Sequence, residues 1–535
     1  MKKNYWKYII LILIFSIIIM LPKILNQYQM NDDTQYHITN TLATVSTMDD
    51  WIPDDILPNI AGSYGYATRQ FYPVLAHTTT AYTMKITNLS VTDTFKLVHT
   101  LVLFLSGVAM FFLGLRYLKK DYLAFTAAII YILMPYHLTD IYIRDALAEC
   151  FIFIFVPIVL NGLSYLFEDK KKFLLLFSIG YIVGMLSHLT MMVYLTVLLI
   201  PFFIINYKKV FNKKTIITLL EAAIIILGVM APNIIQLLQN KAINLYEVFV
   251  PGVMAQGIQH SGLWIQLFDY LGVFNPIFNN SNAKYYFDII ALILLVIVII
   301  KRKEIDFKNY KFIIIFGICS FTMSLIIFPW DLLPNGFRII QFPWRLGTFS
   351  GLALALIAPL ALDKIKVNYK IVCGAMLVLG LLFNTTSDRQ VLNLNSLDYN
   401  AGMGWQKEYL PISAYNNWDD LSSRNYQINV SNGEAKITSD YITDLKFTIS
   451  EDTTVVLPRL YYLGYYLYDS NGNSVSIKES DEGLITASVS AGDYSLIYKQ
   501  TKEVRIAKIV SIITLIVSVL FLLLEGKFKK LEKEV

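Results

Sequence analysis

Two adjacent carboxylates follow the first hydrophobic segment of the chain. In "QYQMNDDTQYHIT" (27–39), Asp32 and Asp33 come a few residues after that segment, and His37 lies four positions beyond Asp33. Residues four apart share one face of a helix, so His37 is placed to contact Asp33. At a membrane surface Asp33 can serve as a general base, with Asp32 assisting or binding a divalent cation. The alternative is a helix cap with solvated acids.

An ion pair at the membrane edge is predicted in "YHLTDIYIRDALAE" (136–149), between two hydrophobic segments. Arg144, Asp145 and Glu149 fall where unpaired charge is costly. The pair Arg144–Glu149 either joins two helices as a structural salt bridge or presents an arginine to a phosphate group.

Two further arginines, Arg338 and Arg345, flank Gln341 in "LPNGFRIIQFPWRLG" (333–347). Arginine beside a tryptophan is common at a membrane edge, because the long side chain reaches the interface. On the outer side, however, positive charge is disfavoured, which argues for a function such as bidentate phosphate binding. His188, in "LSHLT", ends a hydrophobic segment and is either structural or part of a substrate site.

The composition defines an integral membrane protein. Of 535 residues, 55% are hydrophobic and 16% are charged, and the mean hydropathy is +0.51. The cysteines, Cys150, Cys319 and Cys373, lie in apolar segments and cannot form a disulfide framework or a multi-thiolate metal site. The sequence lacks a Gly-rich phosphate loop, a Walker lysine, HExxH and CxxC, so neither ATP nor nucleic acid is expected as a partner.

Twelve segments are predicted as membrane spans, because each approaches the 20 or so apolar residues needed. They lie near residues 6–25, 92–115, 122–139, 147–167, 173–188, 190–207, 215–235, 286–300, 311–328, 346–363, 369–385 and 504–524. The first is expected to be an uncleaved span rather than a signal peptide. The semipolar stretch 71–87 is expected to form an interfacial or re-entrant helix.

Short basic clusters all fall on one side of this arrangement. They lie at Lys2/Lys3/Lys7, Arg116/Lys119/Lys120, Lys170–Lys172, Lys208/Lys209/Lys213/Lys214, Lys301–Lys303, Lys364/Lys366/Lys370 and Lys527/Lys529/Lys530. We expect the protein in the plasma membrane, and the positive-inside rule then places both termini in the cytoplasm. It places the loops 26–91, 236–285 and 329–345 and the segment 386–503 outside.

Residues 386–503 predict an extracytoplasmic β-domain, sandwich-like or a small barrel, because short runs such as "AKITS" and "TTVVLP" alternate apolar and polar residues. Two hairpins are predicted, one turning at 471–473 and one at 491–493. The chain would thus comprise a polytopic helical module (1–385), this domain, and a final span with a basic cytoplasmic tail (504–535).

The order of these parts resembles the GT-C superfamily of membrane glycosyltransferases. In more detail, the chain is similar to bacterial membrane proteins described as related to 6-pyruvoyl-tetrahydropterin synthase, with the YfhO-like proteins as more distant relatives. The matching pieces extend over most of the chain: "DDTQYHI" (32–38), "YPVLAH" (72–77), "IYIRDALAE" (141–149), "LSH" (186–188), "IQFPWRLG" (340–347), "EYLP" (408–411) and "YYLGYYLYDSNG…VSAGDYSLIY" (461–498).

The resemblance implies a GT-C-like fold and transfer of a sugar from a polyprenyl-phosphate-linked donor to a cell-envelope acceptor on the outer face. Inversion at the anomeric carbon would follow from a single displacement. Asp33 takes the place of the catalytic carboxylate and Asp32 that of the second one. No cofactor is certain, and a divalent cation at Asp32 is an option. The substrate-binding residues would be His37, Tyr72, Arg144, Glu149, His188, Arg338, Gln341 and Arg345. Asn40 stands where relatives are expected to have an arginine.

Two other functions fit many of these features. A transporter or flippase of a lipid-linked saccharide also needs many spans and outer arginines, but it should carry ionisable residues near the bilayer midplane and often repeat symmetry. The candidate residues cluster at one face, and no internal repeat is visible. The third option is a non-catalytic scaffold whose β-domain binds a cell-wall polymer. Membrane lipids are partners in every case.

Overall fold

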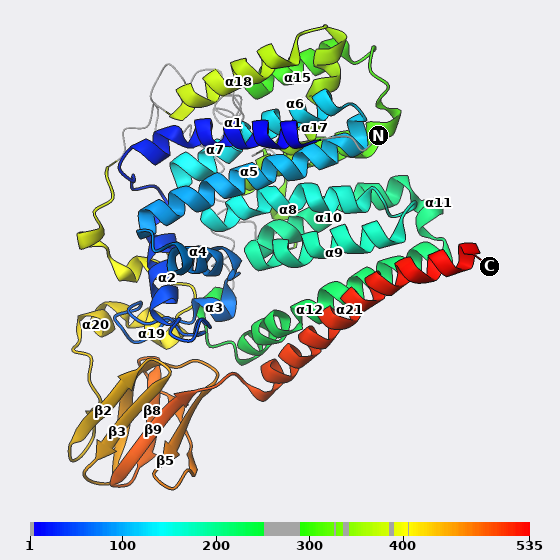
Figure 1. Cartoon of the computed structure of the whole chain (residues 1–535). Coiled ribbons are helices and arrows are strands. Elements are labelled where there is room, and N and C mark those ends of the chain that lie inside the picture. The colour runs from blue at the N-terminus through cyan, green and yellow to red at the C-terminus, as the bar shows by residue number, and fades with distance from the viewer. Residues whose placement is uncertain are drawn as a thin grey trace.

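The computed structural model describes residues 5–250, 289–325, 328–334, 342–384, 390–404 and 406–534. A bundle of helices forms one part, and two β-sheets at the lower left of Figure 1 form the other. A long C-terminal helix leaves the sheets and runs back beside the bundle (Figure 1).

Among the described residues, twelve long helices build the bundle and its C-terminal addition. They are α1 (Trp6–Leu25), α5 (Val91–Leu118), α6 (Asp121–Ile132), α8 (Leu147–Leu163), α9 (Lys170–Ser187), α10 (Leu189–Ile205), α12 (Lys213–Ile243), α15 (Ile289–Lys301), α16 (Lys311–Ser324), α17 (Gly347–Lys364), α18 (Tyr369–Asn384) and α21 (Lys502–Glu534). Each of the twelve segments predicted as a span overlaps one of these helices, but the segment 122–139 is broken between α6 and α7, and the segment near 286–300 is described only from residue 289.

Not all twelve helices meet a strict test for crossing a membrane. Among the described residues, five helices are long and apolar enough: Trp6–Leu25, Val91–Leu118, Lys213–Ile243, Pro343–Lys364 and Lys502–Leu524. A sixth span results if α6 and the following Pro135–Arg144, bent by 41°, count as one. Four shorter apolar helices add to the bundle. The protein is therefore a polytopic helical membrane protein, and the number of twelve spans stays a prediction.

Short elements connect the long helices. The helical ones are α2 (Thr34–Ser46), α3 (Thr68–Phe71), α4 (Leu75–Thr87), α7 (Pro135–Thr139), α11 (Tyr207–Val210), α19 (Ile412–Asn416) and α20 (Trp418–Ser423), with a π-helical turn at Asp140–Arg144. Single 3-10 turns occupy Glu247–Phe249, Phe307–Tyr310, Trp330–Leu332, Pro343–Leu346, Leu394–Ser396 and Tyr399–Met403. The stretch 71–87, predicted to be an interfacial or re-entrant helix, forms α4.

Capping residues set the ends of the long helices. Ser90 starts α5 by accepting a hydrogen bond from the backbone N–H of Asp93 at 3.1 Å, and Asn212 starts α12 by accepting one from Lys214 at 2.9 Å. Both hydroxyl and amide side chains satisfy donors that the first turn leaves unpaired. Lys119 and Asn244, with φ of 60° and 50°, end the same two helices in the left-handed conformation.

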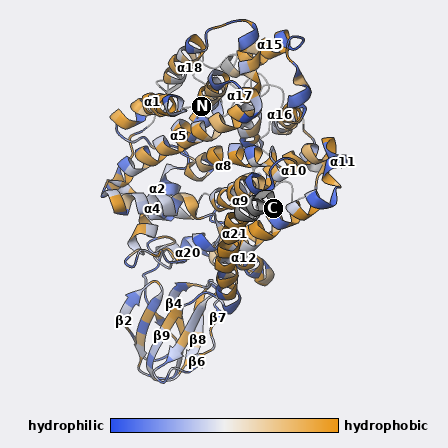
Figure 2. Cartoon of the chain, turned by 45° about the vertical axis from the view of Figure 1, so that its right-hand side comes forward, coloured by the Kyte–Doolittle hydropathy of each residue, from blue (hydrophilic) through white to orange (hydrophobic). Residues whose placement is uncertain are grey.

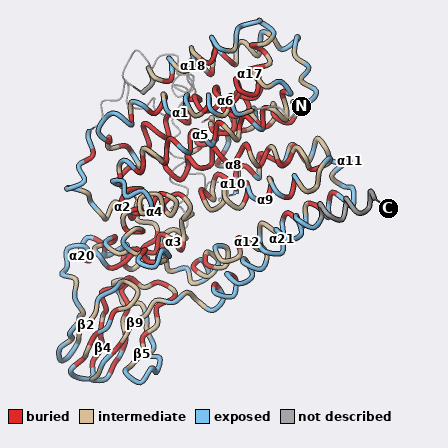
Figure 3. Tube along the Cα trace, viewed as in Figure 1, coloured by how far each residue is buried: buried red, intermediate tan, exposed pale blue. Residues whose placement is uncertain are grey.

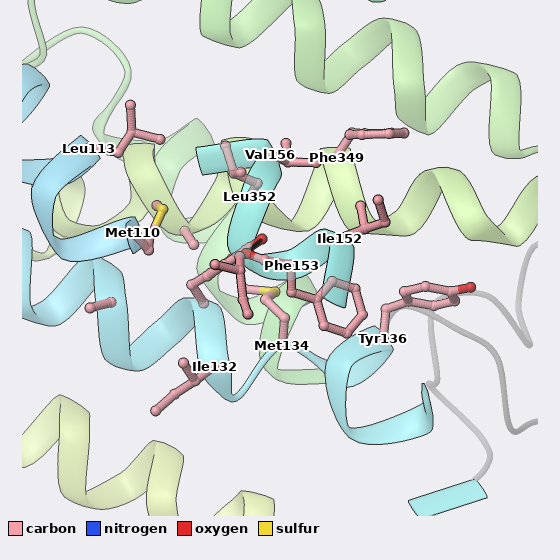
Figure 4. Close-up of a cluster of buried hydrophobic side chains, with 14 of the residues drawn as sticks. Met110, Leu113, Ile132, Met134, Tyr136, Ile152, Phe153, Val156, Phe349 and Leu352 are labelled. Atoms are coloured by element: carbon pink, nitrogen blue, oxygen red, sulfur yellow. Dashed lines mark hydrogen bonds between the residues drawn. The ribbon is translucent and has the colours of Figure 1, made fainter. Parts of the chain in front are cut away.

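The centre of the bundle is formed by α5, α6, α8 and α17, which are largely buried (Figure 3). Figure 4 shows side chains from these helices meeting, with Phe153 of α8 next to Met134 and with Tyr136 at the edge of the cluster. Small residues allow close approach: a Cβ at Gly162 of α8 would lie 2.5 Å from the backbone nitrogen of Phe177 in α9. Such small contact residues are typical of helix pairs in membranes.

The pair α12 and α21 lies beside the bundle, and its outer surface is apolar (Figure 2). Ser511 of α21 donates a hydrogen bond to the backbone carbonyl of Val229 at 2.7 Å, and a Cβ at Gly228 would lie 2.7 Å from Thr514. Only 11% of the most apolar 18-residue stretch of α21 is buried in the protein. This surface is therefore suited to contact with lipid chains.

The two sheets are antiparallel throughout. One has the strand order β1-β4-β8-β7 and the other β2-β3-β9-β5-β6. The strands are β1 (Asn429–Val430), β2 (Ala435–Tyr441), β3 (Asp444–Ile449), β4 (Thr453–Leu460), β5 (Tyr465–Asp469), β6 (Ser474–Val475), β7 (Lys478–Glu479), β8 (Leu484–Val489) and β9 (Gly492–Tyr498). Side chains from both sheets, among them Phe447 and Ile485, belong to one hydrophobic cluster.

One of the two predicted hairpins is confirmed and the other is wrong. β5 and β6 pair with Leu467 opposite Val475 around the turn at 471–473. β8 and β9, by contrast, belong to different sheets, so the short connection at 490–491 carries the chain from one sheet to the other. Gly492, with φ of 150°, is the first residue of β9. Whether the two sheets form a separate sandwich-like domain stays a prediction.

The two ends of the helical bundle differ. The start of α1, the end of α21 and the lysine-containing α11 lie at the right in Figure 1. The sheets, α2 and α4 lie at the left. α1 therefore begins at the end that holds α11 and delivers the chain to α2 at the opposite end, where the candidate residues lie.

Candidate functional site

Asp33 directly precedes α2, at the N-cap position, but does not cap that helix through its side chain. Its backbone N–H donates to the carbonyl of Arg144 at 2.7 Å, and the backbone N–H of Asp32 donates to Ile143 at 3.3 Å. These bonds fix the start of α2 against the π-helical turn. The carboxylate of Asp33 instead accepts a hydrogen bond from Nη2 of Arg144 at 3.3 Å. The helix-cap interpretation of the acidic pair is therefore wrong for the Asp33 side chain.

Arg144 is buried and surrounded by hydrogen-bond acceptors. Its Nη1 donates to Oδ1 of Asp140 at 2.8 Å, to Oε2 of Glu149 at 2.7 Å and to the hydroxyl of Tyr136 at 3.2 Å. The predicted ion pair between Arg144 and Glu149 is present. With its second terminal nitrogen on Asp33, the guanidinium is held by four side chains.

Glu149 joins two of the predicted arginines, Arg144 and Arg345. Its Oε2 lies 2.7 Å from Nη1 of Arg144 and 3.2 Å from Nε of Arg345, while its Oε1 accepts from Tyr136. Arg345 comes from the 3-10 turn Pro343–Leu346, and its guanidinium also lies over the ring of Phe342. The structure thus brings together Asp33, Arg144, Glu149 and Arg345, which were selected from three distant stretches of the sequence.

Asp33 is the accessible carboxylate of this group. Its side chain is 38% exposed, whereas those of Asp140 and Glu149 are 0% and 2% exposed. The surrounding protein removes part of its hydration and raises the pKa of Asp33, while the charges of Arg144 and then Arg345 oppose this shift. A carboxylate that is reachable and has a raised pKa is suited to accept a proton.

A second polar network, behind the first, was missed by the sequence analysis. Its centre is Asp145, a fully buried residue with φ of 60°. Its carboxylate lies 2.6 Å from Nζ of Lys23 and 3.5 Å from Nε2 of His99, and it accepts hydrogen bonds from Tyr28 at 2.8 Å and Thr34 at 2.7 Å. The signal was present, because Lys23 is a charged residue within the first apolar helix.

The Asp145 network connects the end of α1, the middle of α5 and the start of α2. Lys23 also donates to the carbonyl of Ile141 at 2.7 Å, which ties α1 to the π-helical turn. Thr34 follows Asp33 directly in the chain. The network therefore holds both partners of the Asp33–Arg144 contact.

His37 contacts a second histidine rather than Asp33. Its Nδ1 lies 2.8 Å from Nε2 of His77 on α4, and the backbone N–H of His37 donates to the Asp33 carbonyl at 3.1 Å as an ordinary helical bond. Burial lowers the pKa of His37, and it lowers that of His77 to about 3, so both rings are neutral at physiological pH. The expected side-chain contact between His37 and Asp33 is corrected accordingly: the ring is turned toward α4.

The remaining predicted residues differ in where they lie. Tyr72 lies beside Tyr36 and His77, with ring centroids 5.7 and 5.9 Å away, at the edge of the site. His188 is buried and its Nδ1 accepts from the backbone N–H of Met191 at 3.4 Å, so it starts α10. Asp32 is exposed. Arg338 and Gln341 lie outside the described residues.

Asn40, noted as a departure from relatives, is buried and structural. Its side-chain amide donates to the carbonyls of Tyr36 and Gly402, both at 2.9 Å. Across the part of the chain that the structure describes, no group of three or more His, Cys, Asp or Glu side chains is arranged to hold a metal ion. The residues around Asp33 therefore do not form a metal site by themselves.

No family model matches the chain. A protein of Lactococcus lactis subsp. cremoris (strain MG1363), described as uncharacterized, is 24% identical over 351 residues, which make up 62% of this chain. The chain spans 55% of the length of that relative. Among solved structures, the archaeal oligosaccharyltransferase AglB from Archaeoglobus fulgidus, in complex with an inhibitory peptide and a dolichol-phosphate, is similar with a TM-score of 0.45 and 12% identity. That similarity covers 79% of this chain and 60% of AglB.

Proposed function

We propose that this protein is an integral membrane glycosyltransferase that transfers a sugar from a polyprenyl-phosphate-linked donor to a cell-envelope acceptor on the extracytoplasmic face. The observation that carries the proposal is the position and accessibility of the Asp33 carboxylate. Backbone hydrogen bonds of Asp32 and Asp33 to the π-helical turn, together with Arg144, hold it in the loop that follows α1, it does not cap α2, and its carboxylate is accessible. An acid held in this way is suited to catalysis at a membrane surface.

In the proposed reaction Asp33 is the general base. It accepts the proton of the acceptor hydroxyl while that oxygen forms a bond to the anomeric carbon of the donor sugar. The bond between this carbon and the phosphate oxygen breaks, and its electron pair leaves with polyprenyl phosphate. A single displacement of this kind inverts the configuration at the anomeric carbon.

The two arginines receive different roles. In an in-line displacement the base and the leaving phosphate lie on opposite sides of the anomeric carbon. Arg144 lies on the side of the base, because one terminal nitrogen contacts Asp33 and the other is occupied by three acceptors. We therefore assign Arg144 to orienting Asp33. Arg345, held by Glu149, is assigned to the charge that develops on the phosphate, with Arg338 as its proposed partner.

The other parts of the proposal follow from the sequence. The loops 26–91 and 329–345 and the β-rich segment 386–503 are proposed to face the outside, where both the donor lipid and the envelope polymer are reached. The basic termini are proposed to face the cytoplasm. No step is assigned to a metal ion, since the described residues do not supply a ligand set.

The test is sugar transfer by membranes from cells that express the protein. Labelled polyprenyl-phosphate hexoses are supplied, and both the release of polyprenyl phosphate and label in the envelope fraction are measured. Asp33→Asn should reduce transfer by roughly 100-fold or more, the usual scale for loss of a general base. Asp32→Asn, its exposed neighbour, is the matched control and should cost less. Near-normal transfer by Asp33→Asn contradicts the proposal, and movement of intact donor across the membrane without release of polyprenyl phosphate identifies a transporter instead.

A further inference from the structure

A half-buried surface of unused polar groups lies next to Asp33. It is formed by Tyr36 of α2, Tyr72 before α4, and Glu408, which precedes α19. Tyr36 is three residues after Asp33, so the two side chains lie on one side of α2. Tyr36 and Tyr72 meet at right angles, with ring centroids 5.7 Å apart. We call these three residues the Tyr36–Glu408 surface.

The polar atoms of this surface have few partners. Within the part of the chain that the structure describes, neither the Tyr36 nor the Tyr72 hydroxyl makes a hydrogen bond. Glu408 forms no ion pair with any described residue, and its carboxylate interacts with its own backbone N–H. All three side chains are half-buried rather than fully buried, so their polar atoms are within reach of a polar ligand and can exchange hydrogen bonds with it.

The backbone of Glu408 is fixed, which makes this a built arrangement rather than a loose loop. Its carbonyl accepts a hydrogen bond from Val248 at 2.7 Å, and the next residue, Tyr409, donates its N–H to the Tyr66 hydroxyl at 3.0 Å. Tyr462 of the sheet module donates to the Tyr409 carbonyl at 2.9 Å. The backbone that carries the carboxylate is thus held by the segment after α12, the loop before α3 and the loop between β4 and β5.

Glu408 and Tyr36 lie on either side of Gly404, where the missing side chain leaves room between them. A Cβ added to Gly404 would lie 3.6 Å from Oε2 of Glu408 and 3.7 Å from the Tyr36 ring, both ordinary contact distances. Burial raises the pKa of Glu408 to about 7, and its own backbone N–H opposes this shift. Burial raises the pKa of Tyr36 as well, followed by neighbouring tyrosines and by the charges of Glu408 and Asp33. Perturbed groups of this kind gather at functional sites.

We propose that the Tyr36–Glu408 surface binds the acceptor and that the acceptor is an uncharged saccharide rather than a phosphate-rich polymer. This inference rests on the proposed function. Sugar rings have apolar faces that pack on aromatic rings, and their hydroxyls can donate to a carboxylate and exchange hydrogen bonds with tyrosine hydroxyls. A carboxylate that forms no ion pair with any described residue repels phosphate, which disfavours an anionic polymer at this position. A saccharide on Tyr36 presents a hydroxyl toward Asp33, one turn away.

The experiment measures binding to the full chain in nanodiscs by saturation-transfer NMR. The probes are neutral tetrasaccharides (chitotetraose, cellotetraose and maltotetraose), a glycerol-phosphate tetramer as the anionic probe, and undecaprenyl phosphate as the donor-side probe. We expect a neutral tetrasaccharide to bind and the anionic tetramer to bind more weakly. Glu408→Ala and Tyr36→Ala should weaken saccharide binding about tenfold or more, as expected for loss of hydrogen bonds to a charged group or of a stacking ring. Undecaprenyl phosphate binding should be unchanged in both variants.

Controls separate binding from folding. Glu434→Gln, an exposed acid before β2, should leave all binding unchanged. Glu408→Gln should raise the acceptor KM and leave the donor KM and kcat close to wild type, a division that a fold defect does not produce. Equal binding of saccharide by wild type and Glu408→Ala, or preferred binding of the anionic tetramer, overturns the inference. If no tetrasaccharide binds while undecaprenyl phosphate does, this inference fails and the proposed function survives. If undecaprenyl phosphate also fails to bind, the proposed function fails as well.

Discussion

Replacement of Arg144 by lysine should separate the catalytic role of this residue from its structural role. Nη1 of Arg144 donates to Asp140, Glu149 and Tyr136, whereas Nη2 donates to Asp33 alone. A lysine ammonium carries three N–H donors on one nitrogen. It can therefore replace the Nη1 contacts and keep the charge that the buried carboxylates require, but it has no second nitrogen to reach Asp33.

The expected magnitudes differ for stability and for transfer. The contact that Arg144→Lys loses is to a partly exposed carboxylate, and such ion pairs contribute about 1 kcal/mol or less to stability. The loss of orientation of Asp33 is more serious, because a misplaced catalytic group can cost on the order of 100-fold in rate. Arg144→Gln, by contrast, removes the charge between Asp140 and Glu149 and should cost about 3–5 kcal/mol, which is a large part of the stability of a typical protein.

The assay combines thermal unfolding in detergent with sugar transfer at saturating donor. Arg144→Lys should unfold within a few degrees of wild type and transfer sugar roughly 100-fold more slowly. In the Asp33→Asn background the same substitution should add almost nothing, because the contact is already changed. Full activity of Arg144→Lys, or independent losses in the double variant, would refute the role of Arg144 in orienting Asp33.

Three further predictions use other parts of the structure. Because the pKa of Asp33 is raised, kcat/KM should fall as the pH decreases, with a midpoint above the ordinary aspartate pKa of about 4. For the same reason the charged form of Asp33 destabilises the folded protein at neutral pH, so Asp33→Asn should be at least as stable as wild type. Lys23→Met should lower stability by about 3–5 kcal/mol by leaving Asp145 buried without its cation, and adding Asp145→Asn should recover most of it in thermal unfolding. In a cysteine-free background, Asn471→Cys should react with an impermeant thiol reagent in intact cells and Lys303→Cys should not, whereas the reverse pattern contradicts the proposed orientation.

The helices could be predicted from the sequence because their signal is local. An apolar run of sufficient length, bounded by basic residues, identifies each helix without knowledge of its neighbours. The strands were also recognised locally, since alternation marks a strand with one buried face. Their pairing was not local. The turn at 491–493 has the residues of a hairpin, yet β8 pairs with β4 and β9 pairs with β3, over separations that sequence pattern does not encode.

The candidate site divides in the same way. Asp33, Arg144 and Glu149 were recognised because charge is scarce at the ends of apolar segments. The role of His37 was assigned from helical spacing alone, and spacing shows which residues share a face but not which element packs against it. α4 brings His77 to that face. The Asp145 network escaped prediction because its members come from separate segments: Lys23 and His99 look like isolated polar residues, and Asp145 was grouped with its neighbour Arg144 instead.

The π-helical turn at Asp140–Arg144 explains how neighbouring residues serve two networks. In a regular helix Arg144 and Asp145 would follow one another around one axis. Here the wider turn ends in a left-handed residue, Asp145, whose side chain faces Lys23 while that of Arg144 faces Asp33. Such turns cost stability in a helix and are frequent at functional sites. The ion pairs of Lys23 with Asp145 and of Arg144 with its carboxylates offset this cost. The π-helical turn therefore both anchors α1, through Lys23, and directs Arg144 toward Asp33.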